Sequence, residues 1–67
     1  MTLQLQPKLS KIRDERLRRG WTQVTLAYHS GVPVSEVSRV ENGQGTYPAY
    51  LQRLAATLDL QPEELTE

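Results

Sequence analysis

The stretch TQVTLAYHSGVPVSEVSRVENG, residues 22–43, decides the fold. Thr22 is a good helix N-cap, so a helix is predicted over about residues 23–29. Gly31 can adopt the left-handed conformation that ends many helices, and Pro33 disfavours helical geometry in the residue before it. The stretch therefore predicts two short helices joined by a tight turn.

The second helix of this stretch is predicted over residues 34–42 and has two different faces. Val37, Val40 and Glu41 fall at i, i+3 and i+4, so they share one face, and the valines identify it as the buried one. The opposite face carries five residues, most of them polar: Val34, Ser35, Ser38, Arg39 and Asn42. No structural role explains this outward face, and a rigid short helix of this kind fits the major groove of duplex DNA.

An earlier helix is predicted over residues 7–20, with an apolar stripe that contains Leu9, Ile12, Arg16 and Leu17. Arg16 is thus a guanidinium on an apolar stripe, just as Glu41 is a carboxylate on an apolar face. Charged side chains are rarely buried unless they are paired. We therefore predict that Arg16 and Glu41 bind each other, and the alternative is two solvated charges at the edge of the core.

Two more helices are predicted after the stretch. Pro48 suits a first helical position, and the apolar stripe that follows it consists of Leu51, Leu54, Ala55 and Leu58. A last short helix is predicted after Pro62. Residues 1–6 are expected to form an N-terminal arm, either frayed or pairing with another segment, and residues 7–67 to form the folded domain.

The aromatic residues and the single histidine are expected to be structural. The predicted place of Trp21, Tyr28 and Tyr50 is in the core or at its edge. The alternative is a platform on which bases stack, but such a platform needs aromatic rings clustered on one basic face. His29 lacks the partners of a metal cluster, so we expect a surface helix residue. With no Gly-rich phosphate loop either, we expect no enzyme, no metal and no cofactor.

Length and composition narrow the class of protein further. A chain of 67 residues is one small domain, and the absence of cysteine fits a reducing compartment. No apolar run is long enough for a membrane span and the start does not resemble a signal peptide, so a cytoplasmic protein is expected. The net charge is zero, but residues 1–20 carry six basic and two acidic side chains, whereas residues 54–67 carry four acidic and no basic ones.

Residues 22–43, followed by YPAYLQRLAATLDLQPEEL at residues 47–65, resemble the helix-turn-helix family of the phage repressors and Cro proteins, the XRE family. The resemblance covers about residues 9–65. It implies an all-α fold, a compact bundle of five short helices of the lambda-repressor type. It also implies binding to double-stranded DNA, usually as a homodimer on a two-fold site.

The resemblance assigns roles to individual positions. It implies DNA base contacts from the residues Val34, Ser35, Ser38 and Arg39. It implies DNA backbone contacts from Thr22, Gln23 and Asn42. Arg39 is the strongest base reader of this set, because a guanidinium can bind guanine O6 and N7 together.

Three features depart from the family pattern. Pro33 stands where relatives often have a Ser or Thr cap, so the first turn of the recognition helix is expected to lack its side-chain bond. Glu36 is expected near the DNA side, where it repels phosphate unless it binds a cytosine amino group or folds back onto a base such as Arg13. Residues 44–49 contain no Lys or Arg, which predicts few phosphate contacts unless Arg18 and Arg19 supply the charge.

Two functions remain open from the sequence. The first is a sequence-specific transcriptional regulator, a repressor in preference to an activator. We expect no small-molecule effector domain, so its activity would be regulated through its concentration, through dimer formation or through a protein partner. The alternative is an antitoxin-like or accessory protein-interaction module of the same fold. Candidate dimer contacts are Leu58, Leu60, Pro62 and Leu65, or the arm with Leu3 and Leu5.

Overall fold

The computed structural model describes residues 10–61, which form four α-helices. Their bounds are α1 Ser10–Arg18, α2 Gln23–Ser30, α3 Val34–Glu41 and α4 Pro48–Thr57. The all-helical prediction is confirmed, but the described chain has four helices and not five. The fifth helix was expected after Pro62, and it lies outside the described residues, as do the arm at residues 1–6 and the expected first turn of α1.

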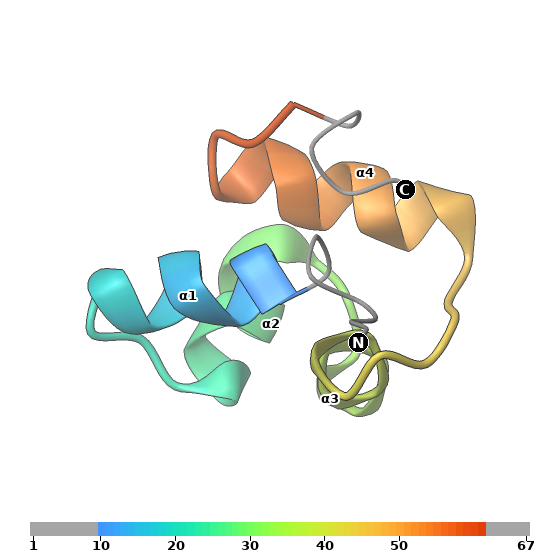
Figure 1. Ribbon diagram of the computed structural model, residues 1–67, viewed down its shortest axis with the longest axis horizontal. Coiled ribbons are helices and arrows are strands. Elements are labelled where there is room, and N and C mark those ends of the chain that lie inside the picture. The colour runs from blue at the N-terminus through green and yellow to red at the C-terminus, as the bar shows by residue number, and fades with distance from the viewer. Residues whose placement is uncertain (1–9, 62–67) are drawn as a thin grey trace, which may run out of the picture.

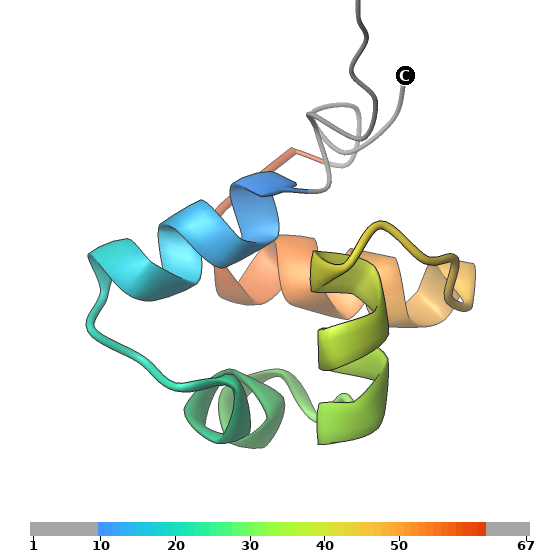
Figure 2. The same cartoon turned by 60° about the horizontal axis from the view of Figure 1, so that its bottom comes forward.

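The helices pack around α2 in an arrangement that leaves one side of α3 free. α2 contacts both α3 and α4, and α1 contacts α3. Figure 1 shows α1 and α4 extending across the molecule while α3 is seen nearly end-on. In Figure 2, α2 is seen end-on and α3 along its length, so the two helices meet at a steep angle. This is the geometry of two helices joined by a tight turn.

The ends of the two central helices follow from local chemistry. Thr22 caps α2, since its Oγ1 accepts a hydrogen bond from the Thr25 amide at 3.1 Å. Gly31 ends α2 in the left-handed conformation with φ 74°, and its amide donates to the Ala27 carbonyl. Both predicted caps are confirmed. Pro33 precedes α3 without a side-chain cap bond, as its side chain requires.

The core is one cluster of buried apolar side chains from all four helices and from the turn before α3. Its members are Ile12, Leu26, Val32, Val37, Val40, Leu54, Ala55 and Leu58. The buried face predicted for α3 is therefore correct. Leu17 was predicted on the apolar stripe of α1 but is 56% exposed. Leu58 is 1% exposed, so it belongs to the core and is not free to form the dimer contact suggested for it.

The aromatic predictions hold in part. Trp21 and Tyr50 are partly buried against the core, as expected at its edge. Tyr28 was also predicted at the core, and this is wrong, because it lies on the outer face of α2 and is 83% exposed. His29 is an exposed helix residue whose ring stacks on Trp21, with 4.5 Å between the ring centroids.

Candidate nucleic-acid interface

A buried ion pair fixes the end of α3 against α1. Arg16 Nε donates to Glu41 Oε2 at 2.7 Å, and Arg16 Nη2 donates to Glu41 Oε1 at 2.9 Å. The Glu41 side chain is fully buried and that of Arg16 is 10% exposed. Two parallel charge-assisted bonds of this kind constrain the orientation as well as the distance of the two groups. The predicted pairing of Arg16 and Glu41 is therefore correct, and the alternative of two solvated charges at the edge of the core is wrong.

Further donors surround the same carboxylate. Gln23 Nε2 donates to Glu41 Oε1 at 3.1 Å, and Arg13 Nε lies 3.6 Å from that oxygen. Arg16 Nη1 also donates to the Trp21 carbonyl at 2.9 Å. The start of α2, the end of α3 and α1 therefore meet at one carboxylate.

These contacts keep Glu41 ionised. Burial by itself raises the pKa of the Glu41 carboxyl, but the hydrogen bonds from Arg16 and Gln23 and the charges of Arg16 and Arg13 outweigh burial. The pKa of Glu41 is therefore lower than usual. The hydrogen bond to Glu41 in turn raises the pKa of Arg16. Both groups are charged at neutral pH.

With its valine face buried and its last turn fixed, α3 presents its other face outward. Val34 is 42% exposed, Ser35, Arg39 and Asn42 are exposed, and Ser38 is half-buried. The Asn42 side chain donates to Ser38 Oγ at 3.5 Å. The residues proposed to contact bases thus share one surface of a short, anchored helix.

The two residues suggested for DNA backbone contact at the start of α2 lie next to each other, but their side chains differ in exposure and in the bonds that they already make. Thr22 is exposed, although its hydroxyl already caps α2. Gln23 is half-buried, and its amide nitrogen is bonded to Glu41. Through this hydrogen bond Gln23 links the start of α2 directly to the end of α3.

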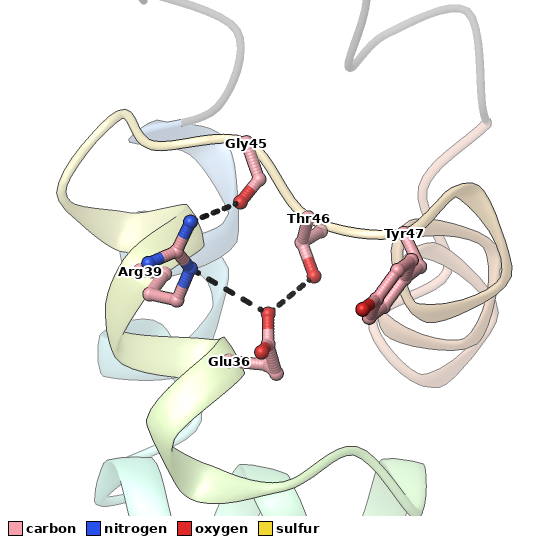
Figure 3. A pocket seen from close by; sticks show the side chains of 5 residues that line it. All are labelled: Glu36, Arg39, Gly45, Thr46 and Tyr47. Carbon is pink, nitrogen blue, oxygen red and sulfur yellow. Dashed lines mark hydrogen bonds and ion pairs between the residues drawn. The ribbon is translucent and has the colours of Figure 1, made fainter.

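A small polar cluster lies between α3 and the loop that follows it, around an open pocket of about 480 Å³ (Figure 3). Thr46 Oγ1 donates to Glu36 Oε1 at 2.7 Å, and Arg39 Nε lies 3.7 Å from the same oxygen. Arg39 Nη2 donates to the Gly45 carbonyl at 3.4 Å. Of the alternatives that the sequence left open for Glu36, folding back onto a basic side chain is the one seen, but the side chain is Arg39 and not Arg13, which faces Glu41.

The sequence reasoning did not find Thr46 or the Gly45 carbonyl. A contact between Glu36 and Arg39 was not predicted either, although their spacing at i and i+3 on one helix could have indicated it. The contribution of the loop had no such signal, since it depends on how residues 44–47 leave α3.

The basic end of α1 is already paired. Arg18 Nη2 lies 2.6 Å and Arg19 Nη1 2.9 Å from Glu15 Oε1. Hydrogen bonds from Arg18 and then Arg19 lower the pKa of the Glu15 carboxyl. Arg19 Nη2 also donates to the Leu58 carbonyl at 3.3 Å. These contacts reduce the charge that α1 offers to a phosphate backbone.

Other kinds of site find little support in residues 10–61. That part of the chain contains no group of three His, Cys, Asp or Glu side chains able to hold a metal ion. None of its helices combines the length and the apolar character needed to cross a membrane.

Two helices meeting at a steep angle through a glycine turn, the second with an exposed polar face, define a helix-turn-helix protein. The model of the helix-turn-helix domain family matches residues 10–67. The chain belongs to this family, and it is a DNA-binding domain of the type found in phage repressors and Cro proteins.

One solved structure and one curated relative are similar to the chain. The structure is the restriction-modification controller protein C.AhdI from Aeromonas hydrophila, which is 36% identical, with a TM-score of 0.76 over 90% of this chain and 92% of that one. The relative is the competence pilus inhibition repressor of Acinetobacter baylyi, which is 49% identical over 45 residues. The match spans 66% of this chain but 41% of that repressor.

Proposed function

We propose that the chain is a sequence-specific transcriptional repressor that inserts α3 into the major groove of double-stranded DNA. Val34, Ser35, Ser38 and Arg39 face the base edges. Thr22, Gln23 and Asn42 lie along the DNA backbone. The protein acts as a homodimer on a two-fold site, and the proposal keeps the cytoplasmic location expected from the sequence.

The observation that carries this proposal is the contrast between the two faces of α3. Val37 and Val40 are fully buried and Glu41 is bonded to Arg16, so the helix is fixed from behind. Its free face bears hydroxyl groups and one guanidinium, which are the groups that read donors and acceptors in the major groove. The similarity to a competence pilus inhibition repressor and to a restriction-modification controller protein supports the same conclusion.

Dimer formation is part of the proposal because one subunit offers few phosphate contacts. Residues 44–49 hold no basic side chain, and Arg18 and Arg19 are paired with Glu15. Two subunits that bind half-sites about one helical turn apart multiply these weak contacts. Analytical ultracentrifugation of the free protein and of its DNA complex tests the stoichiometry.

The second candidate is the antitoxin-like or accessory module that binds a protein partner. The zero net charge and the uncharged loop at residues 44–49 favour it. The exposed Arg39 guanidinium on the polar face of α3 favours DNA binding instead, because a guanidinium can bind guanine O6 and N7 together.

Selection of binding sequences from a randomised duplex pool, at low and at near-physiological salt, tests the proposal. Enrichment of a two-fold site is the expected result. If the folded protein enriches no sequence at either salt concentration, the repressor proposal is wrong and the search moves to a protein partner. Circular dichroism of the same sample establishes that the protein is folded.

A further inference from the structure

The cluster beside α3 lies along one edge of the Arg39 guanidinium. A guanidinium is planar and carries five N–H groups, of which Nε–H and one Nη2–H form its side edge. In Arg39 these two nitrogens face Glu36 Oε1 at 3.7 Å and the Gly45 carbonyl at 3.4 Å (Figure 3). The end edge, formed by Nη1 and the second Nη2 hydrogen, is left for another acceptor.

The carboxylate that faces Arg39 is itself anchored. Glu36 Oε1 accepts the Thr46 hydroxyl at 2.7 Å, and its side chain is 23% exposed. The Arg39 side chain is 52% exposed and stands on the outward face of α3. The anchored carboxylate of Glu36 thus lies beside the exposed guanidinium of Arg39.

We propose that Glu36, held by Thr46, is a positioning residue that directs the end edge of Arg39 toward a guanine. The inference rests on the proposed function, since it requires that Arg39 reads a base. Nη1 and Nη2 then donate to guanine O6 and N7 while the side edge stays on the protein. A side chain ordered before binding loses less conformational freedom on the DNA, so discrimination improves.

This role makes a prediction that simple charge repulsion does not make. A carboxylate that only repels phosphate weakens binding to every sequence by the same factor. A carboxylate that positions Arg39 favours the site with the correct guanine over the site without it. The ratio of the two affinities separates the two effects.

The test compares the selected duplex with one in which the guanine assigned to Arg39 is replaced. Glu36→Gln keeps an oxygen for Thr46 but removes the charge facing Arg39. The ratio of affinities is expected to fall about three- to tenfold, while binding to the substituted duplex does not weaken. Thr46→Val keeps the charge and the shape, and it should lower the ratio in the same direction.

Two control variants isolate the effect. Asp14→Asn makes the same carboxyl-to-amide change at an exposed position of α1 and should leave the ratio unchanged. In an Arg39→Ala background, Glu36→Gln should no longer change the ratio. Thermal unfolding monitored by circular dichroism verifies that each variant is folded.

The possible failures are distinguishable. If the wild type discriminates between the duplexes but Glu36→Gln and Thr46→Val leave the ratio unchanged, the positioning role is wrong and the repressor proposal stands. If Glu36→Gln raises affinity for both duplexes equally, Glu36 only repels phosphate. If the wild type selects no sequence at all, both proposals fall together.

Discussion

The side-chain amide of Gln23 donates to the buried carboxylate of Glu41 over 3.1 Å and so links the start of α2 to the end of α3. Arg16 binds the same carboxylate through two nitrogens. The orientation of the recognition helix therefore depends on polar bonds at its last turn as well as on the valines beneath it. This dependence leads to the first two predictions.

Removing one partner of the buried pair should destabilise the protein strongly. Arg16→Met or Glu41→Gln leaves the other group buried without its partner, which costs about 3 kcal/mol or more in free energy of unfolding. Urea denaturation followed by circular dichroism measures the loss. A loss below about 1 kcal/mol, the range of exposed pairs, would contradict the structural role of this contact.

The double variant Arg16→Met/Glu41→Leu is the control for this prediction. It replaces both charges by apolar groups and leaves no uncompensated charge in the interior. We expect it to be more stable than either single variant, because the large penalty comes from the orphaned partner. Additive losses in the double variant would show that the two side chains act independently.

The acid sensitivity of the fold should depend on the same carboxylate. The pKa of Glu41 is lowered in the folded protein, so its contribution to stability is complete above its ordinary pKa of about 4.3 and is lost as the pH falls through the lower folded value. The difference in free energy of unfolding between the wild type and Glu41→Gln should therefore shrink below about pH 4.3.

Urea denaturation of both proteins at a series of pH values measures this difference. Asp14→Asn, which removes an exposed carboxyl of α1, is the matched control. Its free energy of unfolding should decrease with falling pH as that of the wild type does. A difference between the wild type and Glu41→Gln that is constant over the whole acid range would mean that Glu41 has an ordinary pKa.

Local chemistry explains which parts of the fold could be predicted from the sequence. Thr22 and Gly31 signal helix ends within a few residues of themselves, so both caps were predictable. Arg16 and Glu41 could be matched because each is a charge on an apolar face. Tyr28 could not be placed, since helical periodicity does not distinguish an exposed aromatic ring from one at the core edge.

The candidate site was predictable only for the part that lies on α3. A helix fixes the relative directions of its own side chains, so the outward face could be derived from spacing. Thr46 and Gly45 reach Glu36 and Arg39 through the path of an irregular loop. No periodic pattern specifies that path, and the cluster was visible only in three dimensions.

The turn between α2 and α3 provides a third prediction. Gly31→Ala places a Cβ on a residue with φ 74°, where the nearest other atom is Arg53 Nη1 at an ordinary 3.7 Å. The cost is therefore one of backbone conformation, about 1 to 2 kcal/mol. Gly45→Ala is the matched control, because Gly45 has no positive φ and its added Cβ meets nothing within 4 Å.

Urea midpoints measured for both glycine variants give the comparison. We expect a clear loss of stability for Gly31→Ala and a change within about 0.5 kcal/mol for Gly45→Ala. Equal effects in the two variants would contradict the conformational explanation and would point to a general intolerance of added volume.

The last prediction concerns base recognition by Arg39. Arg39→Ala removes the guanidinium able to bind guanine O6 and N7 together, so discrimination at one base pair of each half-site should fall by about 1 to 3 kcal/mol. The other positions of the selected site should keep their preferences, because Ser35 and Ser38 remain. Sequence selection repeated with the variant shows directly which position is lost.

Arg18→Ala is the control for the charge change. Arg18 is an exposed arginine of α1 that is paired with Glu15, so its removal changes the net charge equally without altering α3. It should weaken binding to all duplexes by one small factor and leave every base preference intact. If Arg39→Ala behaves in the same way, Arg39 contacts phosphate and base reading must come from the hydroxyl groups and Val34.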